Sequence, residues 1–192
     1  MEIGIKKKLR YVLRNILVKK CSILVIIGKG RIGMLEDYRE IVKLLKNQKK
    51  TIATMESCTG GGVVNCITDI EGASEVLRFS AVTYSNEAKV KMGVDKEVID
   101  QYTVYSQEVA DQMSYVISQF ADSDYGVGIT GMLNCIDPAN SQPEKRNMVY
   151  LSIYDRENNC FYRNCIQVHQ FVREKNKETV IQEVGKMLLS IL

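Results

Sequence analysis

The sequence predicts a three-layer α/β/α domain built on a mixed, mostly parallel sheet. Short apolar, β-prone runs alternate along the chain with segments whose apolar residues recur at helical spacing. Two late β-prone runs are separated by only a short polar stretch, which is typical of an antiparallel hairpin and makes the sheet mixed. A length of 192 residues, 45% of them hydrophobic and 26% charged, suits one globular domain with helices on both faces of its sheet.

A helix followed by a buried strand is expected to open this domain. Residues 37–46 place their apolar side chains on one side of a helix, and residues 51–55 form a short β-prone run. The glycine-rich stretch 56–62 then gives a tight turn before helical spacing resumes at Val63. The expected order is strand, glycine turn, helix.

The middle of the chain contains a second strand and two helices. Residues 76–84 read as a strand, and residues 86–91 as a helix that Gly93 ends. Ser106 is a suitable N-cap for a longer helix. The apolar face of that helix is expected to consist of Val109, Met113, Val116, Ile117 and Phe120.

The last third of the chain is expected to supply three strands, a loop and a helix. A buried strand over 125–130 leads into a polar loop at 132–147, and residues 148–154 and 161–168 form the hairpin. The final helix starts near Glu174. Its buried residues are expected to be Val180, Ile181, Val184, Met187, Leu188 and Ile191.

The first 33 residues differ in charge from the rest of the chain. They carry nine Lys or Arg and one acidic residue, which gives this segment a formal charge of +8. Because the whole chain has a net charge of +3, residues 34–192 carry a charge of −5. Residues 34–192 therefore lack the net positive charge that attracts the phosphates of nucleic acid. We interpret residues 1–33 as a basic extension, either an upstream segment preceding a natural start at Met34 or a basic helix over 9–25 that contacts anionic lipid or nucleic acid.

Cysteine and histidine usage argues against a metal cofactor. The six cysteines form no C-x-x-C pair, and His169 is the single histidine. We therefore expect no cofactor, reduced thiols, and a cytoplasmic protein. The longest strongly apolar run, residues 21–28, is far shorter than the roughly 20 residues of a membrane span.

Ser57 is the residue whose position suggests chemistry. It follows a buried strand and precedes small residues that open a helix, where backbone N–H groups and the helix dipole stabilise an anion. The amides around Thr59 and Gly60 are placed to bind an oxyanion. By spacing alone, a phosphate-binding or simply tight turn explains the same pattern. The adjacent Cys58 is a weaker candidate nucleophile because no histidine lies near it in sequence.

Six blocks of sequence follow one another in an order that points to a known family. They are Thr-Met-Glu-Ser-Cys-Thr-Gly-Gly at 54–61, Thr-Asp-Ile-Glu-Gly-Ala-Ser at 68–74, Val-Thr-Tyr-Ser-Asn-Glu-Ala-Lys at 82–89, Gly-Val at 93–94, Ser-Gln-Glu-Val-Ala at 106–110 and Ile-Thr-Gly at 129–131. Together these blocks resemble the CinA C-terminal domain family, also called PncC, over roughly residues 40 to 192. Members of this family are nicotinamide-nucleotide amidases, which convert nicotinamide mononucleotide to nicotinate mononucleotide and ammonia, and some are linked to competence functions.

The resemblance implies a role for each matching residue. Ser57 is the expected nucleophile, Lys89 its general base, and Tyr84 a hydroxyl that positions or relays the proton. A lysine can serve as a base because desolvation lowers its pKa toward neutrality. The implied substrate contacts are Thr59, Gly60, Gly61, Asn86, Thr130, Gly131 and Arg173, the last for the substrate phosphate. The family also implies self-association into a homo-oligomer.

The loop after Gly131 departs from the family pattern. The family continues with a Gly-Pro-Gly-Gly type segment, whereas this chain carries bulky residues such as Leu133 and Ile136. Such side chains reshape a pocket that glycines leave open. This departure keeps a second hypothesis open, in which the domain is a non-catalytic nucleotide-binding or regulatory module in a competence or DNA-damage response.

Overall fold

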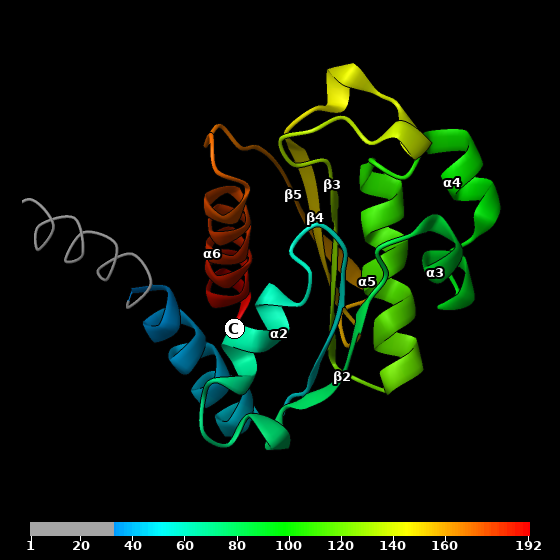
Figure 1. Cartoon of the computed structure of the whole chain (residues 1–192). Coiled ribbons are helices and arrows are strands. Elements are labelled where there is room, and N and C mark those ends of the chain that lie inside the picture. The colour runs from blue at the N-terminus through cyan, green and yellow to red at the C-terminus, as the bar shows by residue number, and fades with distance from the viewer. Residues whose placement is uncertain (1–32) are drawn as a thin grey trace, which may run out of the picture. The chain divides into compact units, whose positions relative to one another are not determined.

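The computed structural model describes residues 33–192, and residues 37–192 form one compact unit. A five-stranded sheet with the order β2-β1-β3-β4-β5 lies at its centre (Figure 1). The strand β1 pairs in parallel with β2 and β3, and the last three strands pair antiparallel, so four of the five strands run in the same direction. This confirms the mixed sheet. The strands are β1 (Ile52–Glu56), β2 (Leu77–Val82), β3 (Tyr125–Gly131), β4 (Met148–Asp155) and β5 (Cys160–Gln167).

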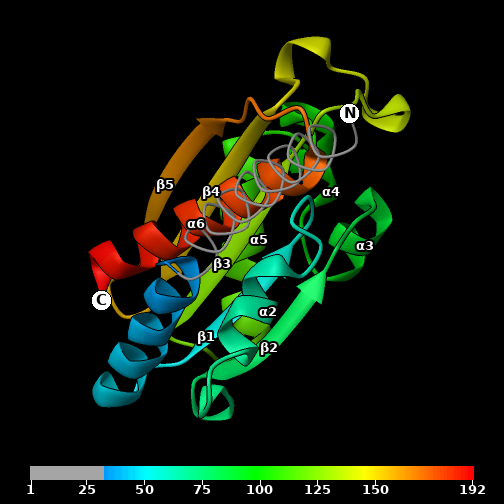
Figure 2. The ribbon, with the colours of Figure 1, turned by 60° about the vertical axis from the view of Figure 1, so that its left-hand side comes forward.

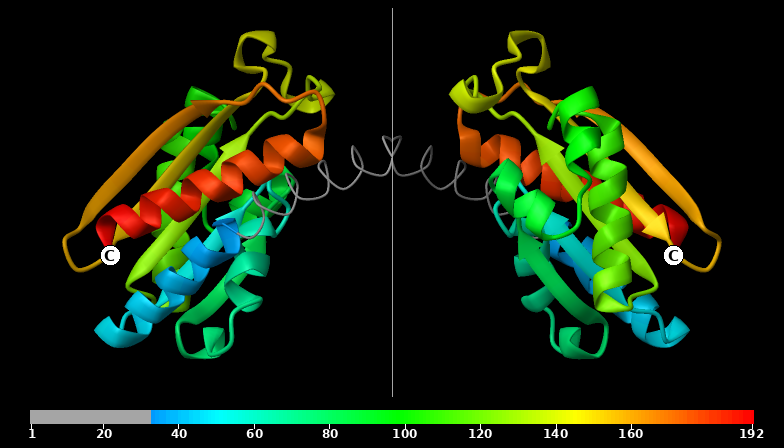
Figure 3. Two further views of the ribbon diagram at one scale, coloured as in Figure 1. Left: turned by 90° about the vertical axis from the view of Figure 1, so that its left-hand side faces the viewer. Right: turned by 90° about the vertical axis from the view of Figure 1, so that its right-hand side faces the viewer.

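Helices cover both faces of this sheet, as predicted. One face carries α5 (Gln107–Ala121), with α3 (Asn86–Lys91) and α4 (Lys96–Tyr102) beside it. The other face carries α2 (Gly62–Thr68) and α6 (Arg173–Ile191), and residues 33–48 form a further helix whose Tyr38 hydroxyl donates to the Ile181 carbonyl of α6 at 2.8 Å. Figures 2 and 3 show α2 and α6 over the same face of the sheet.

The helix α5 lies directly on β3 because two glycines leave room for it. A Cβ atom on Gly126 would lie 1.9 Å from the carbonyl oxygen of Ser114, and one on Gly128 would lie 2.2 Å from that of Ala110. Both distances are far inside van der Waals contact, so only glycine fits at these positions. The close packing fixes β3 in the middle of the domain.

The predicted core faces of the two long helices need correction at their ends. In α5, Val109, Met113 and Ile117 are fully buried, but Val116 is only half-buried and Phe120 is exposed. Phe120 packs on Phe79 of the edge strand β2, with ring centroids 4.9 Å apart. In α6, four of the six predicted residues are buried and the other two, Met187 and Ile191, are half-buried near its end.

Two further differences concern the segments between the main elements. Helix α4 was not predicted, although Asp95 caps it by accepting from the Glu97 amide at 2.9 Å. The segment 132–147 contains only two short 3-10 turns, as expected of a loop, yet its first residues Met132 and Leu133 are buried. Burial of these two apolar side chains anchors the start of the loop to the domain.

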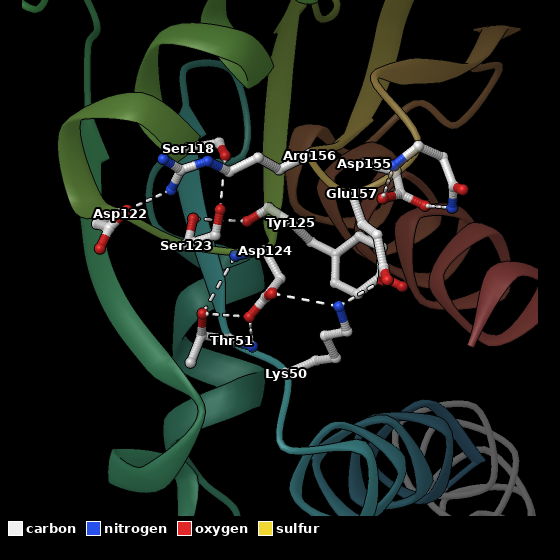
Figure 4. Close-up of polar contacts among 11 residues, drawn as sticks. Lys50, Thr51, Ser118, Asp122, Ser123, Asp124, Tyr125, Asp155, Arg156 and Glu157 are labelled. Carbon is white, nitrogen blue, oxygen red and sulfur yellow. Dashed lines mark hydrogen bonds and ion pairs between the residues drawn. The ribbon is translucent and has the colours of Figure 1, made fainter.

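Polar contacts fix the starts of the central strands (Figure 4). The backbone amide and the hydroxyl of Thr51 both donate to Asp124, each at 2.8 Å, and Lys50 donates to Glu157 at 2.6 Å. These bonds join the residues before β1 and β3 to the β4–β5 turn. Because β1 and β3 are parallel and their amino ends are aligned, their carboxyl ends lie together at the opposite end of the sheet.

The predictions for the N-terminal extension lie outside the described residues, including the basic helix over 9–25. Within residues 33–192, no helix combines the length and apolar character needed to cross a bilayer.

Candidate active site

Ser57 lies where β1 ends, next to the chain that leaves β2. The residues of β1 are all buried, and Ser57 keeps 8% of its surface exposed. The amide of Thr83 donates to the carbonyl of Glu56 at 2.8 Å, which holds the two strand ends side by side. Ser85 then caps α3 by accepting from the Ala88 amide at 3.1 Å. The first turns of α3 therefore start beside the serine.

Lys89 extends from α3 to Ser57. Its Nζ atom lies 3.3 Å from the Ser57 Oγ and donates to the Thr83 carbonyl at 2.7 Å. The side chain is 1% exposed. Burial removes water from the ammonium group and lowers the pKa of Lys89 to about 8, so the neutral amine is accessible near physiological pH. A neutral amine at this distance can accept the serine proton.

Glu56 occupies the N-terminus of α2. Its side chain is fully buried and accepts from the amides of Val63 at 3.1 Å and Val64 at 2.8 Å. It also accepts from the Thr59 hydroxyl at 2.7 Å. A carboxylate at these amides satisfies the helix terminus and complements the helix dipole. The amides of Val63 and Val64 at the start of α2 are therefore occupied by Glu56 of β1, whereas binding of an oxyanion by the amides around Thr59 and Gly60 stays a prediction.

The glycine-rich turn after Ser57 is stabilised by hydrogen bonds between its own residues. The Gly60 amide donates to the Ser57 carbonyl at 3.0 Å, and Gly61 caps α2 with a φ of 88°, a left-handed conformation that favours glycine. Thr59 is fully buried with its hydroxyl on Glu56. Their role as substrate contacts stays a prediction, and in this structure the groups named here shape the turn.

A cavity of about 500 Å³ opens beside Ser57. This volume lies in the range of pockets that hold small ligands. Of the residues expected at the site, the cavity wall includes Ser57, Tyr84, Asn86, Gly131 and Arg173. Thr130 is turned away, since its buried hydroxyl donates to the Val104 carbonyl at 2.8 Å.

Tyr84 and Arg173 meet at the cavity. Tyr84 is 66% exposed, and its hydroxyl accepts from the Arg173 guanidinium at 3.2 Å. Arg173 also donates to the Leu133 carbonyl, which holds the guanidinium against the 132–147 loop. The hydrogen bond of the Tyr84 hydroxyl thus leads to Arg173 rather than to Ser57 or Lys89. Its role in proton relay stays a prediction.

Cys58 lines the cavity but is poorly suited to act as a nucleophile. Burial raises the pKa of its thiol to about 12, so the reactive thiolate is rare at neutral pH. This supports Ser57 as the nucleophilic group of the pair.

Three residues of the cavity wall, Tyr105, Asp137 and Asn140, were given no role at the site from the sequence. The Tyr105 hydroxyl donates to Asp137 at 2.8 Å, and the Asn140 amide donates to the same carboxylate oxygen at 2.9 Å. Asn86 donates to the Asn140 side chain at 2.8 Å, so the 132–147 loop is bonded to the start of α3. Only the Asp-Pro pair at 137–138, a frequent turn signal, marked this place in the sequence.

Comparison with known sequences identifies the family. The CinA C-terminal domain model matches residues 36–192. A CinA-like protein from Kosmotoga olearia is 41% identical over 132 residues, which cover 67% of this chain and 31% of that protein. A CinA-like protein from Endomicrobium trichonymphae is 32% identical over 150 residues, covering 77% of this chain and 35% of that protein. The chain thus spans about a third of the length of these curated relatives.

Solved structures show the same fold. The competence/damage inducible protein CihA from Agrobacterium tumefaciens superposes with a TM-score of 0.75 at 26% identity, covering 82% of this chain and 94% of that one. A CinA superfamily protein from Escherichia coli gives a TM-score of 0.75 at 20% identity, covering 83% and 90%. The matched residues include the whole described site, and the chain belongs to the CinA C-terminal domain family.

Proposed function

We propose that this domain is an amidohydrolase that converts nicotinamide mononucleotide to nicotinate mononucleotide and ammonia. The observation that carries the proposal is the 3.3 Å contact between the Lys89 amine and the Ser57 hydroxyl beside a cavity of about 500 Å³. A serine hydroxyl needs a base before it attacks a carboxamide, and a lysine with a lowered pKa is such a base.

The reaction follows from this pair. Ser57 Oγ attacks the carboxamide carbon while its proton passes to the neutral Lys89 amine. The tetrahedral intermediate then collapses, and Lys89 returns the proton to the departing nitrogen, which leaves as ammonia. Water attacks the resulting ester with Lys89 again accepting the proton, and nicotinate mononucleotide is released as Ser57 is regenerated. The Thr83 carbonyl, 2.7 Å from Nζ, holds the amine in place throughout.

The wall of the cavity supports a phosphorylated substrate. Arg173 lines it and, within residues 33–192, forms no ion pair with a carboxylate. A guanidinium held in place by Tyr84 and the Leu133 carbonyl keeps further donors for an anion. We assign Arg173 to the substrate phosphate and Asn86 to a polar contact within the cavity.

Ammonia release from nicotinamide mononucleotide by the purified protein tests this function. The Ser57→Ala variant is expected to lose on the order of a thousandfold in rate, as removal of a catalytic nucleophile commonly does. Ser190→Ala is the matched control, because Ser190 is exposed on α6 and bonds only within its own helix. Equal activity of the wild type and Ser57→Ala would contradict the proposal.

A regulatory nucleotide-binding module is the second candidate. It is favoured by the 132–147 loop, whose Leu133 and Ile136 line the cavity where the family has a glycine-rich segment. Tight binding of the mononucleotide by a wild-type protein that releases no ammonia would support this candidate over the enzyme.

A further inference from the structure

The cavity beside Ser57 contains charges of both signs. Its charged lining residues are Arg173, Glu87 and Asp137. Asp137 belongs to the 132–147 loop, which lies over the end of the sheet where β3 finishes (Figure 1). It therefore enters the cavity wall from the part of the chain that departs from the family pattern, and it is absent from the reaction described above.

The hydrogen-bonding capacity of Asp137 is largely used within the protein. One carboxylate oxygen accepts from the Tyr105 hydroxyl at 2.8 Å and from the Asn140 side chain at 2.9 Å. The other accepts from the Ala139 amide at 2.9 Å. A carboxylate offers about four acceptor positions, so at most one remains. Such a group is poorly placed to bind two hydroxyls of a ribose, which would need two free acceptors.

The negative charge of Asp137 is not neutralised by these bonds. All three donors are uncharged groups, and within residues 33–192 no Lys, Arg or His nitrogen lies within 4.0 Å of this carboxylate. Hydrogen bonds from Asn140 and Tyr105 lower the pKa of Asp137, which keeps it ionised at physiological pH. The Asp137 carboxylate is thus an anion held in place by hydrogen bonds, with little capacity left for further ones.

Asp137 and Ser57 line the same cavity. Burial lowers the pKa of Lys89, and the negative charge of Asp137 acts in the opposite direction by raising that pKa. A substrate whose carboxamide reaches Ser57 places the ring that bears the carboxamide in the same cavity. The ring of nicotinamide mononucleotide carries a positive charge on its nitrogen.

We propose that Asp137 is a specificity-determining residue that selects amides attached to a cationic ring, through the charge of its carboxylate. This inference rests on the proposed function for the identity of the substrate. Tyr105 and Asn140 are positioning residues that hold the carboxylate in the wall. With Arg173 providing the opposite charge, the cavity matches a dipolar ligand that carries a cation and an anion.

Two ligands that differ in ring charge test the proposal. Nicotinamide mononucleotide has a cationic ring, and its dihydro form has a neutral ring with the same ribose, phosphate and carboxamide. Binding of both is measured by calorimetry at pH 8 in the Ser57→Ala chain, where turnover is blocked. We expect the cationic ligand to bind about five- to tenfold more tightly, the size expected for a charge pair that is partly exposed to water.

Three variants in the same chain separate charge from loop structure. Asp137→Asn keeps an acceptor for Tyr105 and removes the charge, and the preference is expected to fall below about twofold. Glu144→Gln removes a charge from an exposed position in the same loop that is outside the cavity wall, and it is expected to keep the preference. Tyr105→Phe keeps the charge but removes one of the hydrogen bonds that position the carboxylate, so the preference for the cationic ligand is expected to fall only in part.

The outcomes distinguish this inference from the proposed function. Equal binding of the two ligands by the Ser57→Ala chain, or a preference retained in Asp137→Asn, would overturn the role of Asp137. A preference lost in Glu87→Gln instead would assign the selectivity to the other carboxylate. A charge preference that depends on Asp137, in a protein that releases no ammonia from the mononucleotide, would uphold the inference and reject the amidase.

Discussion

The Lys89 amine lies 3.3 Å from the Ser57 hydroxyl although 32 positions separate the two residues in the chain. Three local structures create this contact. Parallel β1 and β2 end side by side, the amide of Thr83 bonds to Glu56, and the Ser85 cap starts α3 at once, so Lys89 turns back toward β1. The contact is a property of the fold as much as of the two side chains.

The first prediction concerns the pH dependence of ammonia release. The proposed base must be neutral, and the pKa of Lys89 is lowered to about 8 by burial. The rate constant kcat/KM is therefore expected to rise with pH through about 8 and then level off. Lys89→Arg keeps the charge but stays protonated at every accessible pH, so it is expected to be inactive across the profile. A profile that is flat from pH 6 to 10 would contradict the assignment of the base.

The second prediction is that the burial of Lys89 lowers the free energy of unfolding. Its pKa in the folded protein, about 8, lies below the ordinary value of 10.5, so the unfolded chain binds the proton more tightly. The cost is fully present below pH 8 and disappears as the pH rises from about 8 to 10.5. Lys89→Met is expected to be about 1–2 kcal/mol more stable than the wild type at pH 7, after allowing for the lost bond to Thr83.

Urea unfolding at pH 7 and pH 10 measures this difference. The advantage of Lys89→Met is expected to shrink at the higher pH, whereas Lys91→Met, an exposed change on the same helix, is expected to stay within about 0.5 kcal/mol of the wild type at both. A Lys89→Met variant that is less stable than the wild type at pH 7 would show that the amine is favourably solvated within the fold.

The third prediction separates Tyr84 from the proton transfer. Its hydroxyl bonds to Arg173 at 3.2 Å, so Tyr84→Phe loosens the guanidinium assigned to the substrate phosphate. We expect KM to rise about three- to tenfold with little change in kcat, the effect of losing one partly exposed hydrogen bond. Steady-state kinetics checks this split. A loss confined to kcat would instead support the role in proton relay that the family resemblance implies.

The fourth prediction concerns Glu56, which supports the turn that carries Ser57. Glu56→Gln replaces one of two acceptor oxygens by a donor facing the amides of α2 or the Thr59 hydroxyl. The variant is expected to lose about 2–4 kcal/mol of stability in urea unfolding. Glu71→Gln, at an exposed position, is the matched control. Equal stability of both variants would mean that the buried carboxylate contributes nothing to the turn.

Much of the fold could be predicted because local patterns agree with it. The strand, glycine turn and helix around Ser57 follow from residue type and spacing, and the helix over residues 86–91 coincides with α3. Phe120 shows where periodicity alone fails. Its position matches the apolar face of α5, but it packs on a residue of an edge strand and stays exposed, because spacing along a helix says nothing about where the sheet ends.

The candidate site was predictable only in part. Family motifs singled out Ser57 and Lys89, which the fold brings together, whereas a lysine on a helix after a strand is by itself typical of a solvent-exposed charge. Asp137 was not recognised because its position in the cavity depends on Tyr105 and Asn140, which hold the loop through bonds between residues distant in sequence. Contacts of this kind depend on tertiary structure and leave no spacing pattern to read.

A double-mutant cycle in ammonia release tests the central claim most directly, namely that Lys89 and Ser57 act as one catalytic unit. Ser57→Ala, Lys89→Ala and the double variant are compared with the wild type on nicotinamide mononucleotide. Groups that act together are strongly non-additive, so each single change is expected to reduce kcat by about a thousandfold and the double change by no more than either single one. Losses that multiply, or a Lys89→Ala variant with wild-type kcat, would contradict the account.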